Sequence, residues 1–105
     1  MYLDSAATKS LFCDEDLLGN VRKSKYRTEI QTNAGVGEVT KEGDVPGFRI
    51  VMFSDQAIAN LLALNELCER YHVTFDSEKE NAFNVRLDDD GIMKFACDED
   101  RMYSF

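Results

Sequence analysis

The sequence predicts a single, mainly β domain with one helix, and three observations lead to this fold class. In residues 26–32, less polar and more polar side chains alternate with a period of two, as in a strand with one buried face. Clusters of Asn, Asp, Gly and Pro interrupt the chain between short apolar segments, as turns do in β domains. Only residues 59–70 repeat their apolar positions at intervals of three and four. The length of 105 residues and the hydrophobic share of 44% suffice for one core.

The predicted strands follow one another with short turns between them. Residues 26–32 are expected to form a hairpin with a second strand through Val39, joined by the flexible Asn-Ala-Gly-Val-Gly segment. Asp-Val-Pro-Gly at residues 44–47 predicts a turn, because proline fixes φ and glycine accepts a positive φ. A second turn is predicted at residues 88–91. Further strands are predicted at residues 48–53, 72–75, 83–87, 92–97 and 102–105, the last of them an edge strand.

Residues 59–70 are predicted to form the helix of the domain. Its apolar positions form one stripe, made of Leu61, Leu64, Leu67 and Cys68. Asn60, or the Ser-Asp pair at residues 54–55, is expected to cap the start of this helix. Glu66 lies on the predicted helix and is expected to face water.

The charge of the chain limits its partners. Acidic residues outnumber basic ones by 20 to 12, which gives a formal net charge of −8. Nucleic acids and anionic membranes need a basic face on the protein, so we expect neither as a partner. The one basic cluster, residues 22–25, is expected to be a solvated strand entry.

The cysteines and the single histidine indicate no metal or redox chemistry. Cys13, Cys68 and Cys97 are far apart and odd in number, and His72 has no partner at metal-ligand spacing. We therefore expect no metal, no cofactor, a reduced cytoplasmic location and cysteines that serve as small core residues. The sequence shows neither a leader-peptide pattern nor an apolar run long enough to span a bilayer, which also favours a cytoplasmic protein.

The most informative stretch is Asp-Ser-Ala-Ala-Thr at residues 4–8, directly after the apolar pair Tyr2 and Leu3. From the residues alone, three roles are open for Asp4. It can cap a helix over residues 5–12, because Asp is a favoured N-cap and alanine favours helix. It can be a turn residue at the end of a strand. It can also be a catalytic carboxylate, and only the context in the rest of the chain can favour this third role.

That context is a set of segments in a particular order. Leu-Asp-Ser-Ala-Ala-Thr at residues 3–8 is followed by Leu-Phe-Cys-Asp at residues 11–14, and Asn-Leu-Leu-Ala-Leu-Asn-Glu-Leu occupies residues 60–67. Glycine-rich and closing segments lie at residues 32–37, 43–47, 71–76 and 90–91. In this order they resemble the protease domain of Copia-type retrotransposon Gag-Pol polyproteins, a retropepsin-like aspartic protease. In that family a Leu-Asp-Ser-Gly-Ala-Thr/Ser segment opens the domain, and Asn-Leu-Leu-Ser-Leu-x-Glu-Leu precedes and forms the single helix.

The resemblance implies a fold and an assembly. The fold is a retropepsin-like closed β-sheet (the acid protease fold) with one short helix, formed by residues 1–105 as a single domain. Family members carry a strand ahead of the Asp loop, so the chain is expected to be a fragment of a longer polyprotein that lacks this strand. Because each subunit of the family supplies one catalytic Asp, the resemblance also implies a homodimer that acts on a polypeptide substrate.

By this resemblance Asp4 is the catalytic carboxylate, and the two Asp4 of a homodimer lie about 3 Å apart and share one proton. Together they activate a water molecule for attack on the scissile carbonyl, without a metal or a cofactor. Ser5 is expected to bond the neighbouring loop across the dimer axis, while Ala7 and Thr8 fill the family's alanine and final hydroxyl positions. Ala6 replaces the glycine of the motif, at a cost of roughly 1–2 kcal/mol if φ at this position is positive.

A second candidate site lies in the glycine-rich middle of the chain. Gly35, Val36 and Gly37 are the candidate tip of a substrate-binding flap, where glycine lets the backbone approach an extended substrate. An ordinary hairpin turn is the alternative for these residues.

The function implied is that of an aspartic endopeptidase that processes the polyprotein containing it, in the cytoplasm and within virus-like particles. The alternative is a catalytically degenerate, protease-like domain that binds peptides or mediates self-association, and Ala6 is the residue that favours it. A plain structural β domain of a larger protein is a third possibility.

Overall fold

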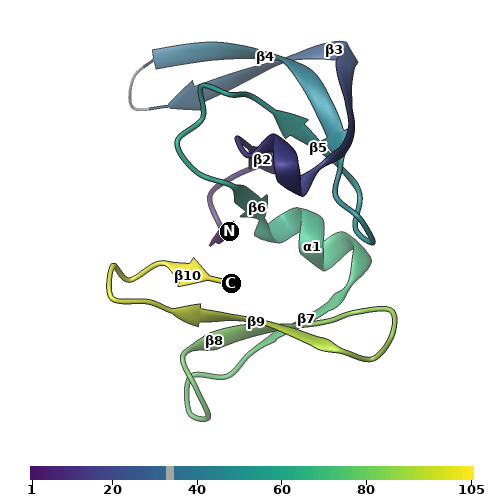
Figure 1. The fold of residues 1–105 in the computed structure, drawn as a ribbon. Coiled ribbons are helices and arrows are strands. Elements are labelled where there is room, and N and C mark those ends of the chain that lie inside the picture. Colours follow the sequence, from purple (N-terminus) through teal and green to yellow (C-terminus); the bar gives the residue numbers. More distant parts are fainter. Residues whose placement is uncertain (33–34) are drawn as a thin grey trace. The chain divides into compact units, whose positions relative to one another are not determined.

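The computed structural model describes residues 1–32 and 35–105, of which residues 26, 28, 30–32, 35 and 36 are described by their backbone only. This described chain forms two compact units (Figure 1). The first unit comprises Met1–Ser10 and Leu61–Phe105, and the second comprises Leu11–Asn60. Strands dominate both units, so the predicted mainly β class is confirmed. That all 105 residues form one domain stays a prediction.

The first unit is an open sheet with the α-helix of the described chain beside it. Its strands lie in the order β6, β1, β10, β9, β8, β7. Their bounds are Tyr2–Asp4 for β1, Leu61–Ala63 for β6, His72–Phe75 for β7, Ala82–Arg86 for β8, Ile92–Cys97 for β9 and Tyr103–Ser104 for β10. Strands β1 and β6 run parallel, and the other neighbours run antiparallel. Helix α1, Leu64–Arg70, follows β6 without a loop.

An apolar face holds the antiparallel part of this unit together. The pairing registers set Phe75 opposite Phe83 and Phe83 opposite Phe95, so the three aromatic side chains lie on the same face of the sheet. The rings of Phe83 and Tyr103 meet edge to face with their centroids 4.8 Å apart. Phe95 and Val85 are fully buried, which places the centre of this core on β8 and β9.

The second unit is a smaller open sheet, and its longest strands form a hairpin. Its strand order is β3, β4, β5, β2, with β2 and β5 parallel. The bounds are Leu11–Phe12 for β2, Gly19–Thr32 for β3, Gly35–Asp44 for β4 and Ile50–Phe53 for β5, and a 3-10 turn η1 spans Glu15–Leu17. The predicted turn at residues 44–47 is confirmed, since Gly47 has a φ of 76° and the amide N–H of Phe48 donates to the carbonyl O of Val45 at 3.0 Å.

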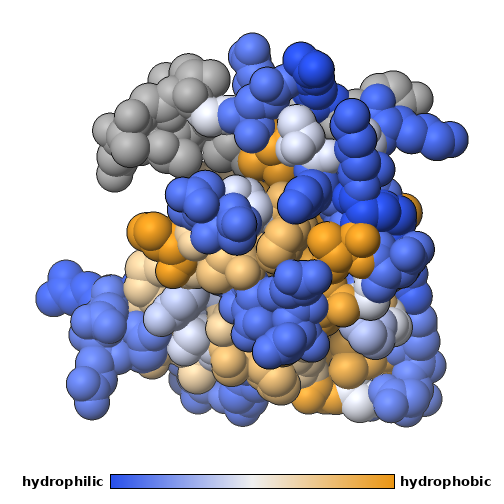
Figure 2. All heavy atoms as spheres, turned by 45° about the horizontal axis from the view of Figure 1, so that its top comes forward, coloured by the Kyte–Doolittle hydropathy of each residue, from blue (hydrophilic) through white to orange (hydrophobic). Residues whose placement is uncertain are grey.

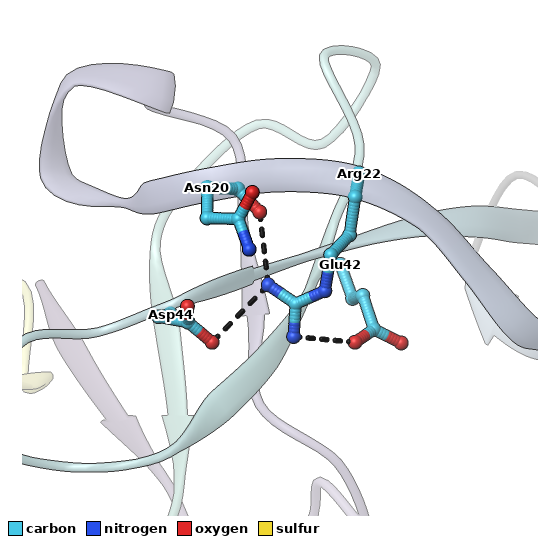
Figure 3. A network of polar contacts seen from close by, with 4 residues as sticks. All are labelled: Asn20, Arg22, Glu42 and Asp44. Carbon is cyan, nitrogen blue, oxygen red and sulfur yellow. Dashed lines mark hydrogen bonds and ion pairs between the residues drawn. The ribbon is translucent and has the colours of Figure 1, made fainter.

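A polar network fastens the start of the long hairpin (Figure 3). Arg22 pairs across the strands with Glu42 at 2.8 Å and with Asp44 at 3.2 Å, and it also donates to the carbonyl O of Asn20 at 2.9 Å. Arg22 therefore cross-links β3 and β4. Of the basic cluster predicted as a solvated strand entry, Lys23 and Lys25 are exposed, whereas Arg22 is held by this network.

The helix is shorter than predicted, and residues 61–63 of the predicted span form a strand instead. Leu61–Ala63 pairs in parallel with β1, and α1 begins only at Leu64. Ala63 is the cap residue and makes no side-chain cap hydrogen bond, so the predicted capping by Asn60 or residues 54–55 is wrong. The Asn60 amide oxygen instead accepts the amide N–H groups of Cys13 and Asp14, at 2.9 and 3.0 Å. Pairing with a strand far away in sequence overrides the local apolar spacing.

Three further expectations are corrected. The sheets are not closed, since no pairing among the described residues joins β6 to β7 in the first unit or β3 to β2 in the second. Strand β10 is not an edge strand, because it lies between β1 and β9. The cysteines are not core residues: Cys68 is exposed, and Cys13 and Cys97 are half-buried. Cys68 faces solvent because the short helix turns its Glu66 and Leu67 inward instead.

The face drawn in Figure 2 carries both hydrophilic and apolar side chains. The exposed large apolar residues are Leu17, Ile50, Ile58, Phe75, Ile92, Met102 and Phe105. Among the described residues, no helix has the length and apolar character that crossing a membrane requires.

Candidate active site

Asp4 stands at the carboxyl end of β1, next to the point where α1 begins. In the parallel pairing of β1 with β6, Leu3 lies level with Leu62 and Asp4 lies level with Ala63. Leu3 and Leu62 are buried, at 7% and 3% exposure, so the strand that carries Asp4 is anchored in the core. Because α1 starts at the residue after Ala63, the Asp4 loop and the first turn of the helix emerge at the same edge.

The carboxylate of Asp4 folds back on its own loop. Its Oδ1 accepts the amide N–H of Ala6 at 2.9 Å, which is the hydrogen bond of an Asx turn. Residues 5–10 contain no helix, so the helix-cap role that the sequence left open is wrong. The role of a turn residue at a strand end is confirmed. A catalytic role stays a prediction and is compatible with this geometry, because the turn bond engages Oδ1, which is one of the two carboxylate oxygens.

Ala6 does not need the conformational freedom of glycine. Among the described residues other than glycine, positive φ angles occur at Asn20, Asp90 and Arg101, and Ala6 is not one of them. The cost that would follow from a positive φ at Ala6 therefore does not arise. Alanine fits the backbone of this loop, and what remains of the substitution is one exposed methyl group.

The outward part of the loop is open to other molecules. Ser5, Ala6 and Thr8 are exposed, and Ala7 is half-buried. The predicted catalytic segment thus lies at the end of β1 and in the short loop that follows it. The hydroxyl of Ser5 is accessible, as its expected bond to a second chain requires.

Two buried polar residues that the sequence did not place in a site lie behind this loop. The Ser10 Oγ accepts the amide N–H of Ala63 at 2.9 Å, and the Ser10 amide N–H donates to the Glu66 Oε1 at 2.5 Å. Ser10 is 1% exposed and Glu66 is 6% exposed, so the prediction that Glu66 faces water is wrong. The sequence signal for Glu66 was its place in an apolar segment, directly before Leu67.

The candidate flap residues lie in the second unit. Gly35, Val36 and Gly37 belong to β4 and pair with residues 30–32 of β3, so a hairpin is present around them. Asn33 and Ala34, which belong to the same glycine-rich segment, lie outside the described residues. Gly37 is exposed. Their role as a substrate-binding flap stays a prediction.

Several other acidic residues of the first unit hold turns or form ion pairs. In the turns at residues 88–91 and 98–102, Asp89 accepts the amide N–H of Gly91 and Asp98 accepts that of Asp100, both at 2.9 Å. The Asp88 carboxylate pairs with Arg70 at 2.9 Å, and this hydrogen bond is the main reason that the pKa of Arg70 is raised. No cluster of three or more His, Cys, Asp or Glu that could hold a metal ion occurs in the described part of the chain.

The first unit thus holds the Asp4 carboxylate on an accessible turn and, behind it, the buried pair Ser10 and Glu66. Such an arrangement can supply a single acid–base group to a reaction. A second carboxylate for a shared-proton pair would have to come from another copy of the chain. Comparison of the chain with protein-family models, with curated proteins and with solved structures found no match.

Proposed function

We propose that the chain is an aspartic endopeptidase of the retrotransposon type, which cleaves extended polypeptides and processes the polyprotein that contains it. The observation that carries this proposal is Asp4, a half-buried carboxylate on an accessible turn at the end of a core-anchored strand. The Leu-Asp-Ser-Ala-Ala-Thr order around it and the helix segment at residues 60–67 support the assignment by their resemblance to Copia-type proteases. The proposed place of action is the cytoplasm, within virus-like particles.

In the proposed reaction two copies of the chain form a homodimer, and their Asp4 carboxylates share one proton at a separation of about 3 Å. The charged carboxylate takes a proton from a bound water molecule, and the resulting hydroxide attacks the scissile carbonyl carbon. The protonated carboxylate donates to the developing oxyanion, and a proton then passes to the leaving amine as the C–N bond breaks. The chemistry requires no metal and no cofactor.

The loop residues have supporting roles in this proposal. The Asx turn from Asp4 to Ala6 fixes the backbone beside the carboxylate. Ser5 uses its exposed hydroxyl to bond the partner's loop, and Ala7 and Thr8 complete the turn. Gly35, Val36 and Gly37 cover an extended peptide as a flap.

The second candidate function is a protease-like domain that binds peptides or mediates self-association without cleavage. The exposed methyl group of Ala6, which replaces the motif glycine two residues from Asp4, favours it. In this case the loop geometry serves recognition alone.

Cleavage of a mixed peptide library at mildly acid pH distinguishes the two functions. We expect the chain to cut extended peptides and its Asp4→Asn variant to lose at least about a thousandfold in kcat/KM, since the variant lacks the proton-accepting carboxylate. Asn keeps the acceptor oxygen that bonds Ala6, so the variant is a matched control for folding. Equal cutting by both chains, or no cutting by a folded and dimeric sample, would refute the protease proposal, and the second outcome would favour the binding domain.

A further inference from the structure

Ser10 and Glu66 are the two buried residues with polar or charged side chains among those whose side chains the structure describes. Burial of such groups costs free energy unless hydrogen bonds replace those made to water. In the described chain, every buried side-chain nitrogen or oxygen has a hydrogen-bond partner. A buried, fully bonded polar pair in a small core breaks the usual pattern of apolar interiors, and such exceptions concentrate at functional sites.

The pair lies at the root of the Asp4 loop. Ala63 is the register partner of Asp4, and its amide N–H donates to the Ser10 Oγ at 2.9 Å. The Ser10 amide N–H in turn donates to the Glu66 Oε1 at 2.5 Å. Asp4 and Ser10, the two ends of the loop, are therefore both fastened to residues 63–66, where β6 passes directly into α1.

A third contact ties the middle of the loop to the same helix. The Asn65 side-chain amide donates to the carbonyl O of Thr8 at 3.4 Å. The loop at residues 5–9 is thus held at three points by residues 63–66. The points are its two ends, Asp4 and Ser10, and the carbonyl O of Thr8. A change at Ser10 or Glu66 is therefore expected to alter the path of the loop.

We propose that Ser10 and Glu66 are positioning residues for the Asp4 carboxylate, an inference that rests on the proposed protease function. Two carboxylates that share a proton must each be held within about 0.5 Å of their productive position, because a misplacement of about 1 Å is enough to cost about 100-fold in rate. The Ser10 and Glu66 bonds restrict the loop to one path, so each Asp4 reaches the dimer axis in the same orientation. Neither residue contacts the substrate.

Kinetics of three variants, with a fourth as the control, tests the role. Ser10→Ala removes the acceptor of the Ala63 N–H, and Glu66→Ala removes the acceptor of the Ser10 N–H. Both are expected to lower kcat by about 10- to 100-fold with KM within about twofold, because the loop moves and the substrate contacts do not. Glu66→Gln keeps an acceptor oxygen and is expected to restore most of the kcat. Cys68→Ala, at an exposed position on the same helix, is the control expected to match the parent chain.

Amide hydrogen exchange gives a readout that does not depend on activity. The Ser10 and Ala63 N–H groups are expected to exchange slowly in the parent chain, and Glu66→Ala is expected to release the Ser10 N–H while the strand amides of β8 and β9 keep their protection. Fast exchange at Ser10 in the parent chain, or a folded Glu66→Ala variant with unchanged kcat, would overturn the inference. If cleavage is absent or independent of Asp4, the protease proposal and the positioning role fail together, and slow exchange at Ser10 then identifies the pair as a structural tie alone.

Discussion

At the scale of single residues, the geometry of the Asp4 loop is set by side chains that satisfy backbone groups. The Asp4 carboxylate bonds the N–H of Ala6, and the Ser10 hydroxyl bonds the N–H of Ala63. A loop without regular secondary structure must find partners for its amide groups in this way. The catalytic hypothesis for Asp4 and the observed turn are therefore compatible, since one carboxylate can shape its loop and still offer an oxygen to water.

Ala6→Gly tests whether alanine adopts the backbone conformation of this loop without strain. Since φ of Ala6 is not positive, glycine gains nothing in the folded state and adds conformational freedom to the unfolded chain. We expect the variant to lower the free energy of unfolding by about 0.4–1 kcal/mol, measured by urea denaturation. A stabilised variant would mean that Ala6 is strained. The cleavage assay on the same variant shows whether the alanine methyl hinders turnover.

At the scale of elements, the segment at residues 61–70 divides between a strand and a helix. Local spacing predicts that Leu61, Leu64, Leu67 and Cys68 face the core together, whereas the structure buries Leu62 and Leu67 and exposes Cys68. The difference arises because β6 presents alternate residues to the core and α1 presents residues three or four apart.

The free energies of unfolding of Leu62→Ala and Cys68→Ala test which of the two side chains is buried. Leu62 is 3% exposed, so its truncation leaves a cavity, and we expect a loss of about 2–5 kcal/mol in the free energy of unfolding. Cys68→Ala is expected to change it by no more than about 0.5 kcal/mol, because the side chain is exposed. A continuous helix over residues 59–70 would give the opposite ranking in urea denaturation.

A surface ion pair ties Glu80 to β9 and gives the first unit a small pH dependence. Lys94 lies 2.6 Å from Glu80, and hydrogen bonds from Lys94 and then from Asn84 lower the pKa of Glu80 from its ordinary value of 4.5. A lowered folded-state pKa contributes stability above the unfolded pKa, and this contribution is lost as the pH falls through the folded one. Glu80→Gln is therefore expected to unfold with a slightly weaker pH dependence below about pH 4.5. If the free energy of unfolding, measured by urea denaturation, has the same pH dependence below about pH 4.5 in both chains, the ion pair does not contribute to stability.

At the scale of the whole molecule, the proposed function requires two chains, because each supplies one Asp4. Activity per chain is expected to fall on dilution as the homodimer dissociates. Asp4→Asn chains added in excess are expected to inhibit the parent chain, since mixed dimers carry one carboxylate only. Peptide cleavage, measured together with sedimentation, checks both effects. Activity per chain that is constant on dilution and indifferent to the added variant would contradict a shared site.

The sequence by itself determined the features that depend on neighbours along the chain. Strands β7 and β9 begin and end at the predicted residues, and the turns at residues 44–47 and 88–91 form as expected. Alternation, glycine and proline act over a few residues, so their effects are written in the local sequence. The same holds for the Asp4 turn, which was one of three roles that the residues left open.

Only the tertiary structure decided the features that depend on distant partners. Residues 61–63 become a strand because β1 pairs with them, although their spacing also suits a helix. Glu66 turns inward because it accepts the amide N–H of Ser10, and Ser10 lies 56 positions earlier in the chain. Whether the sheet of each unit is open or closed depends on which strands pair, and composition does not specify this pairing. Hydrogen bonds between segments far apart in sequence leave no periodic trace in either segment, so their outcome appears only once the chain has folded.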